Sequence, residues 1–269
     1  MPPEPASPVG LHRAPDSPVK GLAVFERRVT EPRATIVCVH GGLDRGGSFA
    51  RLARRTDGFD VVAYDRRGYQ ASRALGPLSL DAHVSDLVAV VERERARGPV
   101  IVFGHSYGGV VTFAACAQQP RLANLVVNYE SSLPWVLARP SSRPVVSSDP
   151  AAEAETFFRR MVSDQAWERL SEPERESRRL DGPALINDLR VVRGPAPFAL
   201  RDVTVPAVYV HGDGPLVRYY RALCREIVVV NPSIVTQEMS HAGHGVHLSS
   251  PDQLARLLSD LWDETCASA

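Results

Sequence analysis

"VIVFGHSYGGVV", residues 100–111, begins with a run of branched apolar residues and ends at the start of a second apolar run. Ser106 and the glycines around it lie between the two runs. If the first run is a strand and 107–118 is a helix, the residue at the turn must adopt a strained backbone with positive φ. Gly104 and Gly108 then prevent clashes, because they carry no side chain where the chain approaches itself. The turn would present the Ser106 hydroxyl at a helix N-terminus, where backbone N–H groups can stabilise an oxyanion. The G-x-S-x-G spacing therefore predicts a nucleophilic serine.

Strand and helix patterns alternate on both sides of this stretch. The short, continuous and β-branched apolar runs that we expect to be buried strands are 34–39, 59–64, 99–103, 123–129 and 205–210. Apolar residues recur at helical spacing over 80–96, and a further helix is expected from Pro251 onward. The alternation predicts an α/β fold with a mostly parallel central sheet flanked by helices.

The chain is long enough for one large domain, with 269 residues of which 44% are hydrophobic. Residues 1–20 are rich in proline and predict a disordered leader. Between 131 and 200 the strand alternation stops and charged helical patterns replace it, which indicates a helical cap insertion. The core of the fold is then expected in 21–130 and 201–269.

Charge and composition exclude several classes of partner. The formal net charge is +0, with a pI of about 7.1, so there is no global electrostatic case for nucleic acid or an anionic membrane. No apolar run approaches the roughly 20 residues that a membrane span needs, and the proline-rich N-terminal stretch lacks the apolar region expected of a secretory signal. The cysteines form no CxxC pair. These patterns predict a cytoplasmic protein acting on a small molecule, with its oligomeric state open.

A serine nucleophile needs a base, and a cluster of histidines lies downstream in "EMSHAGHGVHLSSPDQL". His241, His244 and His247 follow one another at three-residue spacing. Zinc sites of that kind usually add a carboxylate or cysteines, which this loop lacks, so we expect no metal. One of the histidines as the base of a Ser-His-acid triad fits better, and the role of His241 is open.

Four motifs in this order resemble the α/β-hydrolase superfamily. They are HGGLDRGGSF (40–49), YDRRGYQAS (64–72), GHSYGG (104–109) and AGHGVHLSSPDQL (242–254). The last is similar to the family's G-H-x-x-H-L ending, which assigns the base to His244. The resemblance also implies an oxyanion hole formed by the backbone N–H groups of Gly42 and Tyr107. Gln70 stands where the family's second motif usually has a glycine.

The acid of the triad departs from the common pattern. After the strand 205–210 the family often reads H-G-x-x-D-P, but here "HGDGPLV" is one residue shorter and places Asp213 out of register. The stretch "NYESSLPW" resembles a bacterial subgroup with a Y-E-P-P element, which makes Glu130 a second candidate. We prefer Glu130 and keep Asp213 as the alternative.

The resemblance implies cofactor-free hydrolysis of an ester, thioester, lactone or related carbonyl substrate through an acyl-enzyme. Two other activities stay open, a non-hydrolytic lyase using the same triad and a small-molecule binding protein on this scaffold. Large apolar residues of the insertion are expected either to line the substrate pocket or to form the insertion's own core, and the pocket candidates are Trp135, Phe157 and Trp167.

Overall fold

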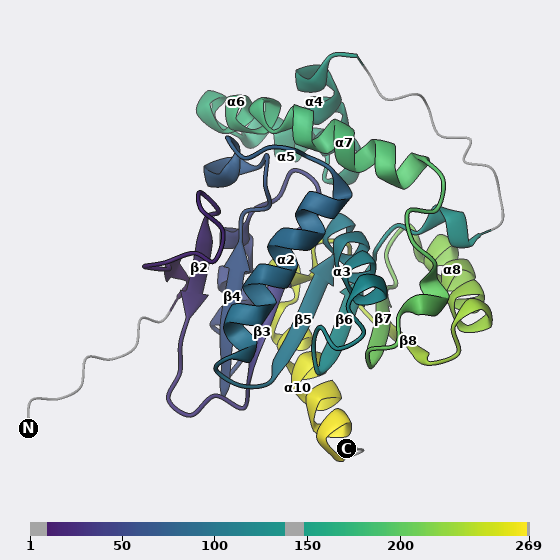
Figure 1. Cartoon of the computed structure of the whole chain (residues 1–269). Coiled ribbons are helices and arrows are strands. Elements are labelled where there is room, and N and C mark those ends of the chain that lie inside the picture. Colours follow the sequence, from purple (N-terminus) through teal and green to yellow (C-terminus); the bar gives the residue numbers. More distant parts are fainter. Residues whose placement is uncertain (1–9, 138–147, 268–269) are drawn as a thin grey trace, which may run out of the picture.

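The computed structural model describes residues 10–137 and 148–267, which form an eight-stranded sheet with helices on both faces (Figure 1). The strands are His12–Arg13 (β1), Val24–Arg27 (β2), Ala34–Val39 (β3), Phe59–Tyr64 (β4), Val100–His105 (β5), Leu125–Tyr129 (β6), Ala207–Gly212 (β7) and Ile234–Met239 (β8). Their spatial order is β1-β2-β4-β3-β5-β6-β7-β8. All pairs from β4 to β8 are parallel, whereas β1 and β2 pair antiparallel at one edge. The predicted fold class is confirmed.

Both faces of the sheet are covered, which explains why its strands read as continuous apolar runs. Along β3, Val37 and Val39 pack on one face, and Ile36 and Cys38 pack on the other. The first face is covered by α2 (Leu80–Arg95), α3 (Tyr107–Gln118) and α8 (Val217–Val230). The second is covered by α1 (Ala50–Ala53) and α10 (Pro251–Ala267).

Among the described residues, four α-helices lie between β6 and β7, in the segment predicted as a cap insertion (Figure 1). They are α4 (Pro150–Met161), α5 (Asp164–Arg169), α6 (Glu172–Leu180) and α7 (Gly182–Arg193). Their shared core includes Phe158, Trp167 and Leu189, and it extends to Leu43 and Tyr69 in loops of the sheet domain. The cap is thus packed directly onto the loops that follow β3 and β4. Residues 138–147 of the predicted insertion lie outside the described residues.

Short elements complete the order of the chain. They are the 3₁₀ helices Gly46–Phe49 (η1), Gln70–Ser72 (η2), Pro134–Val136 (η3) and Leu200–Asp202 (η4), and the one-turn helix Val246–Ser249 (α9). None of the described helices combines the length and the apolar character that crossing a membrane requires.

The structure differs from the predicted leader over residues 10–20, while 1–9 lie outside the described residues. His12 and Arg13 pair with β2, and the amide of Ala14 donates to the carbonyl of Val24 at 2.9 Å. Ala14 is buried. The segment is ordered because its backbone groups complete the edge of the sheet, a long-range pairing that proline-rich composition does not reveal.

Candidate active site

The turn from β5 to α3 holds Ser106 with φ 53° and ψ −122°, a strained conformation for a residue with a side chain. The close approach of the chain leaves no room at the two glycines. A Cβ on Gly104 would lie 2.4 Å from the Asn128 side-chain oxygen, and one on Gly108 would lie 2.0 Å from the Val39 carbonyl oxygen. The glycines therefore permit the sharp turn that presents Ser106.

Glu130 and His244 meet at the carboxyl end of β6. The Glu130 Oε2 atom lies 2.7 Å from Nδ1 of His244, and its other carboxylate oxygen accepts the Gly212 N–H at 3.0 Å. Glu130 is itself strained, with φ 48°, and it is buried. The loop carrying the histidine is held by the Tyr129 hydroxyl, which donates to the Gly243 carbonyl at 2.9 Å. The carboxylate thus fixes the imidazole with Nδ1 protonated, so that Nε2 is left as a base.

Asp213 is exposed, and its carboxylate binds the backbone of the turn that precedes His244 in the chain. Its carboxylate accepts N–H groups from His241 at 2.9 Å and from Ala242 at 3.2 Å. These backbone hydrogen bonds lower the pKa of Asp213, so it stays ionised. His241 adopts φ 58° in this turn. Of the two predicted acids, the structure brings only Glu130 to the ring of His244, and Asp213 shapes the turn that precedes it.

A cavity of about 530 Å³ lies between the cap and the carboxyl ends of the strands. The predicted site residues that line it are Ser106, His244, Glu130, Gly42, Tyr107 and Phe157. The two residues implied for the oxyanion hole therefore face the same cavity as the serine.

Trp135 and Trp167 do not belong to this lining, which corrects two of the three predicted pocket residues. Trp167 is fully buried, with its ring centroid 5.4 Å from that of Phe158 in the cap core. Trp135 packs on Phe198 at 5.7 Å. Only Phe157 of the predicted three faces the cavity. Trp167 therefore stabilises the core of the cap, whereas Trp135 packs against the apolar cluster on one face of the sheet.

Sequence reasoning missed most of the cavity wall. The wall includes Leu185, Leu189 and Val192 of α7, and Leu216, Tyr219 and Tyr220 at and within α8. A signal for the α7 group exists, since its spacing of four and three residues places it on one helix face. The α8 residues gave no comparable signal, because that helix was not predicted.

The loop after β3 is held rigidly beneath the cavity. Nδ1 of His40 donates to the Gly41 carbonyl at 2.7 Å, and Nε2 accepts the Arg66 N–H at 2.8 Å. Burial lowers the pKa of His40 to about 3, so the ring stays neutral in this role. Asp65 accepts N–H groups from Gly46 and Ala71 and fixes the neighbouring turn.

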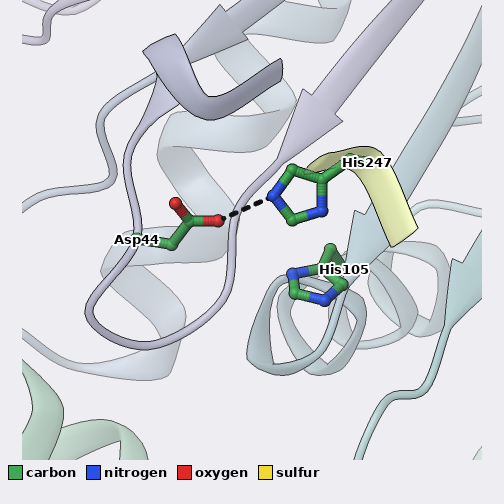
Figure 2. Close-up of side chains that lie close together, drawn as sticks. All are labelled: Asp44, His105 and His247. Atoms are coloured by element: carbon green, nitrogen blue, oxygen red, sulfur yellow. Dashed lines mark ion pairs between the residues drawn. The ribbon is translucent and has the colours of Figure 1, made fainter. Parts of the chain in front are cut away.

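Three further side chains, those of Asp44, His105 and His247, lie close together (Figure 2). Asp44, after β3, lies 3.3 Å from Nε2 of His247 in α9, and the rings of His105 and His247 are 4.6 Å apart. His105 also donates to the His244 carbonyl at 2.7 Å. Burial of the Asp44 carboxylate by itself raises the pKa of Asp44. The contact with His247 outweighs this effect and lowers that pKa well below its usual range.

These three side chains are the described residues best suited to hold a metal. One ligand atom from each of Asp44, His105 and His247 lies within 4.8 Å of the others. Two imidazoles and a carboxylate are a ligand set that zinc accepts. The histidine loop lacks a carboxylate of its own, but the fold supplies one from the loop after β3. The absence of a metal stays a prediction, tested below.

The sequence model of the alpha/beta hydrolase family matches residues 36–257, which is most of the chain. The chain belongs to the alpha/beta hydrolase family. Lipase LipV of Mycobacterium tuberculosis is 35% identical over 95 residues, covering 35% of this chain and 36% of that protein. The monoacylglycerol lipase of Mycolicibacterium smegmatis is 34% identical over 98 residues, covering 34% and 35%. The match thus spans about a third of the length of these curated relatives.

Solved structures extend the similarity over nearly the whole chain. An alpha/beta hydrolase from Sphaerobacter thermophilus superposes with a TM-score of 0.65 at 22% identity, covering 93% of this chain and 100% of that one. At this identity the likeness concerns the fold.

Proposed function

We propose that the chain is a serine hydrolase that cleaves an ester or a related carbonyl substrate through the triad Ser106, His244 and Glu130. The observation that carries the proposal is the 2.7 Å contact between Glu130 and Nδ1 of His244, in a cavity that Ser106 also lines. A buried acid that orients a histidine beside a strained serine is the arrangement that nucleophilic acyl transfer requires.

The reaction proceeds in two halves. The Ser106 Oγ attacks the substrate carbonyl carbon, and its proton passes to Nε2 of His244. The imidazolium then donates this proton to the leaving group, and the acyl group stays on the serine. Water, deprotonated by the same histidine, attacks the acyl-enzyme and releases the acid. Glu130 keeps the histidine in the required tautomer and stabilises its protonated form.

The oxyanion formed in each half is bound by backbone N–H groups of Tyr107 and Gly42. Both residues line the cavity beside the serine, and Tyr107 begins α3. Loss of one such donor typically costs about 3 kcal/mol of transition-state stabilisation. Serine, histidine, acid and amide donors together complete the chemistry, so the reaction that we propose uses no cofactor.

The serine is tested by covalent labelling. A fluorophosphonate should add once to the intact protein, as read by mass spectrometry, and the same protein should hydrolyse 4-nitrophenyl esters. Both signals should disappear in Ser106→Ala. Labelling that persists in this variant would contradict the assignment, and labelling without turnover of any ester would favour a lyase or a binding protein on the same scaffold.

A further inference from the structure

The cavity-facing side of α4 carries one cation among apolar residues. Phe157, Arg160 and Met161 all line the cavity, and their spacing of three and four residues puts them on one helix face. The guanidinium carbon of Arg160 lies 5.5 Å from the centroid of the Phe157 ring. The arginine is thus held at the cavity wall beside an aromatic side chain.

Neighbouring arginines of the cap are engaged elsewhere. Arg159, Arg175 and Arg179 form ion pairs with glutamates on the cap surface. Arg178 donates to the Leu43 carbonyl oxygen. Arg160, by contrast, has no ion-pair partner among residues 10–137 and 148–267.

The other charged residues of the cavity wall have partners within the protein. Glu130 binds His244 and the Gly212 amide. Asp188 accepts hydrogen bonds from the buried Arg66 guanidinium and, at 2.6 Å, from the Tyr69 hydroxyl.

Arg193 lies 3.8 Å from Glu153, so it too has an acidic neighbour. In the described part of the wall, Arg160 therefore contributes a positive charge that no carboxylate of the protein balances.

We propose that Arg160 binds a carboxylate of the substrate, so that this enzyme acts on esters that carry an anionic group. The inference rests on the proposed function and extends it to a class of substrate. A guanidinium presents parallel N–H donors that match a carboxylate. The Arg160 side chain is solvent-exposed, and its contact with the Phe157 ring keeps the guanidinium at the cavity wall, where a substrate can reach it. The aliphatic walls, with Leu185, Leu189 and Met161, suit the apolar chain between the carboxylate and the scissile carbonyl.

Matched substrates test this assignment and locate the carboxylate. The mono-4-nitrophenyl ester of glutaric acid carries it on the acyl side, and 4-nitrophenyl pentanoate is the neutral match. The pentanoate ester of 4-hydroxybenzoic acid carries the carboxylate on the leaving group. Its neutral match is the pentanoate ester of methyl 4-hydroxybenzoate. The measured quantity is the ratio of kcat/KM for each anionic substrate to that for its neutral match.

In Arg160→Gln one of the two ratios should fall by about tenfold, the effect of losing one charge-assisted contact. The pair that responds identifies the side on which the carboxylate lies. Arg169→Gln is the control, because Arg169 makes the same charge change on the cap surface without lining the cavity. Unchanged ratios in Arg160→Gln, or an equal fall in Arg169→Gln, would overturn the assignment.

A binding measurement separates this inference from the proposed chemistry. Monoethyl glutarate should bind the Ser106→Ala protein by calorimetry, and about tenfold more weakly when Arg160→Gln is added. Weaker binding in the double variant supports the carboxylate site even if no ester is hydrolysed. Equal binding with and without Arg160, when the parent protein is labelled at Ser106 and hydrolyses esters, contradicts the carboxylate site alone.

Discussion

Two of the three residues proposed for the triad have a strained backbone. Ser106 and Glu130 both adopt positive φ, at 53° and 48°, although both carry side chains. Such conformations cost of order 1–3 kcal/mol each and persist only where the surrounding structure enforces them. Here the enforcement is direct, because the Ser106 amide donates to the Tyr129 carbonyl and the Glu130 amide to the Val210 carbonyl, both at 2.9 Å. The backbone of β6 and β7 thus sets the relative position of nucleophile and acid.

The two candidate acids should respond differently to isosteric substitution. Glu130→Gln should lower turnover about 10⁴-fold, because a neutral amide does not hold His244 in the tautomer that accepts the serine proton. Asp213→Asn should have a mild effect, since its carboxylate binds backbone N–H groups of the turn. The measurement is kcat on the best ester found, with substrate affinity followed separately. The reverse order would mean that Asp213 reaches the histidine, and mild losses in both would contradict the triad.

At the scale of elements, the cap is joined to the sheet domain by buried polar contacts. Arg66, after β4, is fully buried and pairs with Asp188 of α7 at 2.6 Å. A second contact joins Arg73 to Asp181 at 2.7 Å, with the Arg73 side chain 34% exposed. These pairs set how α7 lies across the cavity, and so they connect the stability of the cap to the shape of the substrate site.

Removal of one charge from the buried pair should destabilise the protein strongly. Asp188→Asn removes the carboxylate partner of the fully buried Arg66 guanidinium, so the free energy of unfolding should fall by about 3–5 kcal/mol. Asp181→Asn is the matched control, and its loss should be smaller because water can solvate Arg73. Urea unfolding of both variants measures the difference. Equal losses would show that burial of Arg66 is not the deciding factor.

Asp44, His105 and His247 come from three separate segments and could together bind a metal ion. We expect ester hydrolysis to survive exhaustive dialysis against a chelator, because the proposed triad and the amide donors complete the reaction. Activity before and after dialysis, with added Zn²⁺ as the second arm, checks this. A loss that Zn²⁺ restores in the parent protein but not in His247→Asn would reverse the expectation and assign a metal to this cluster.

For the molecule as a whole, we expect buried histidines to lower stability in acid. Burial lowers the pKa of His40 to about 3 and the pKa values of His83 and His105 well below their ordinary range. The unfolded chain therefore binds protons at a higher pH than the folded one. Below the ordinary histidine pKa of about 6.5, each such group favours unfolding by about 1.4 kcal/mol per pH unit.

The free energy of unfolding should thus fall as the pH is lowered from about 7.5 to about 5, and His40→Gln should reduce this dependence. The measurement is the urea midpoint at both pH values, and comparing slopes removes the general cost of the substitution. The exposed His12, replaced in the same way, is the control and should leave the slope unchanged. If His40→Gln keeps the full slope, proton uptake by His40 does not contribute to acid unfolding.

The sequence by itself determined the fold class and the serine turn. Strands buried on both faces read as short apolar runs, and helices follow the spacing of their apolar residues, so both are encoded locally. The role of Ser106 was predictable for the same reason. The glycines on either side of it are required by a sharp strand-to-helix turn, which is a local feature of the chain. β8 gave no such signal, since its sequence includes Thr236, Gln237 and Glu238 at an edge of the sheet.

Only the tertiary structure decided which acid meets the histidine and which side chains face the cavity. Glu130 and Asp213 directly follow the neighbouring strands β6 and β7, yet the Glu130 carboxylate contacts His244 whereas the Asp213 carboxylate accepts backbone N–H groups of His241 and Ala242. Likewise, Trp167 and Phe157 look equivalent in sequence, yet one fills the cap core and the other lines the cavity. The physical reason is that local patterns encode backbone conformation and burial. The contacts between distant segments depend on how strands register and helices rotate when they pack.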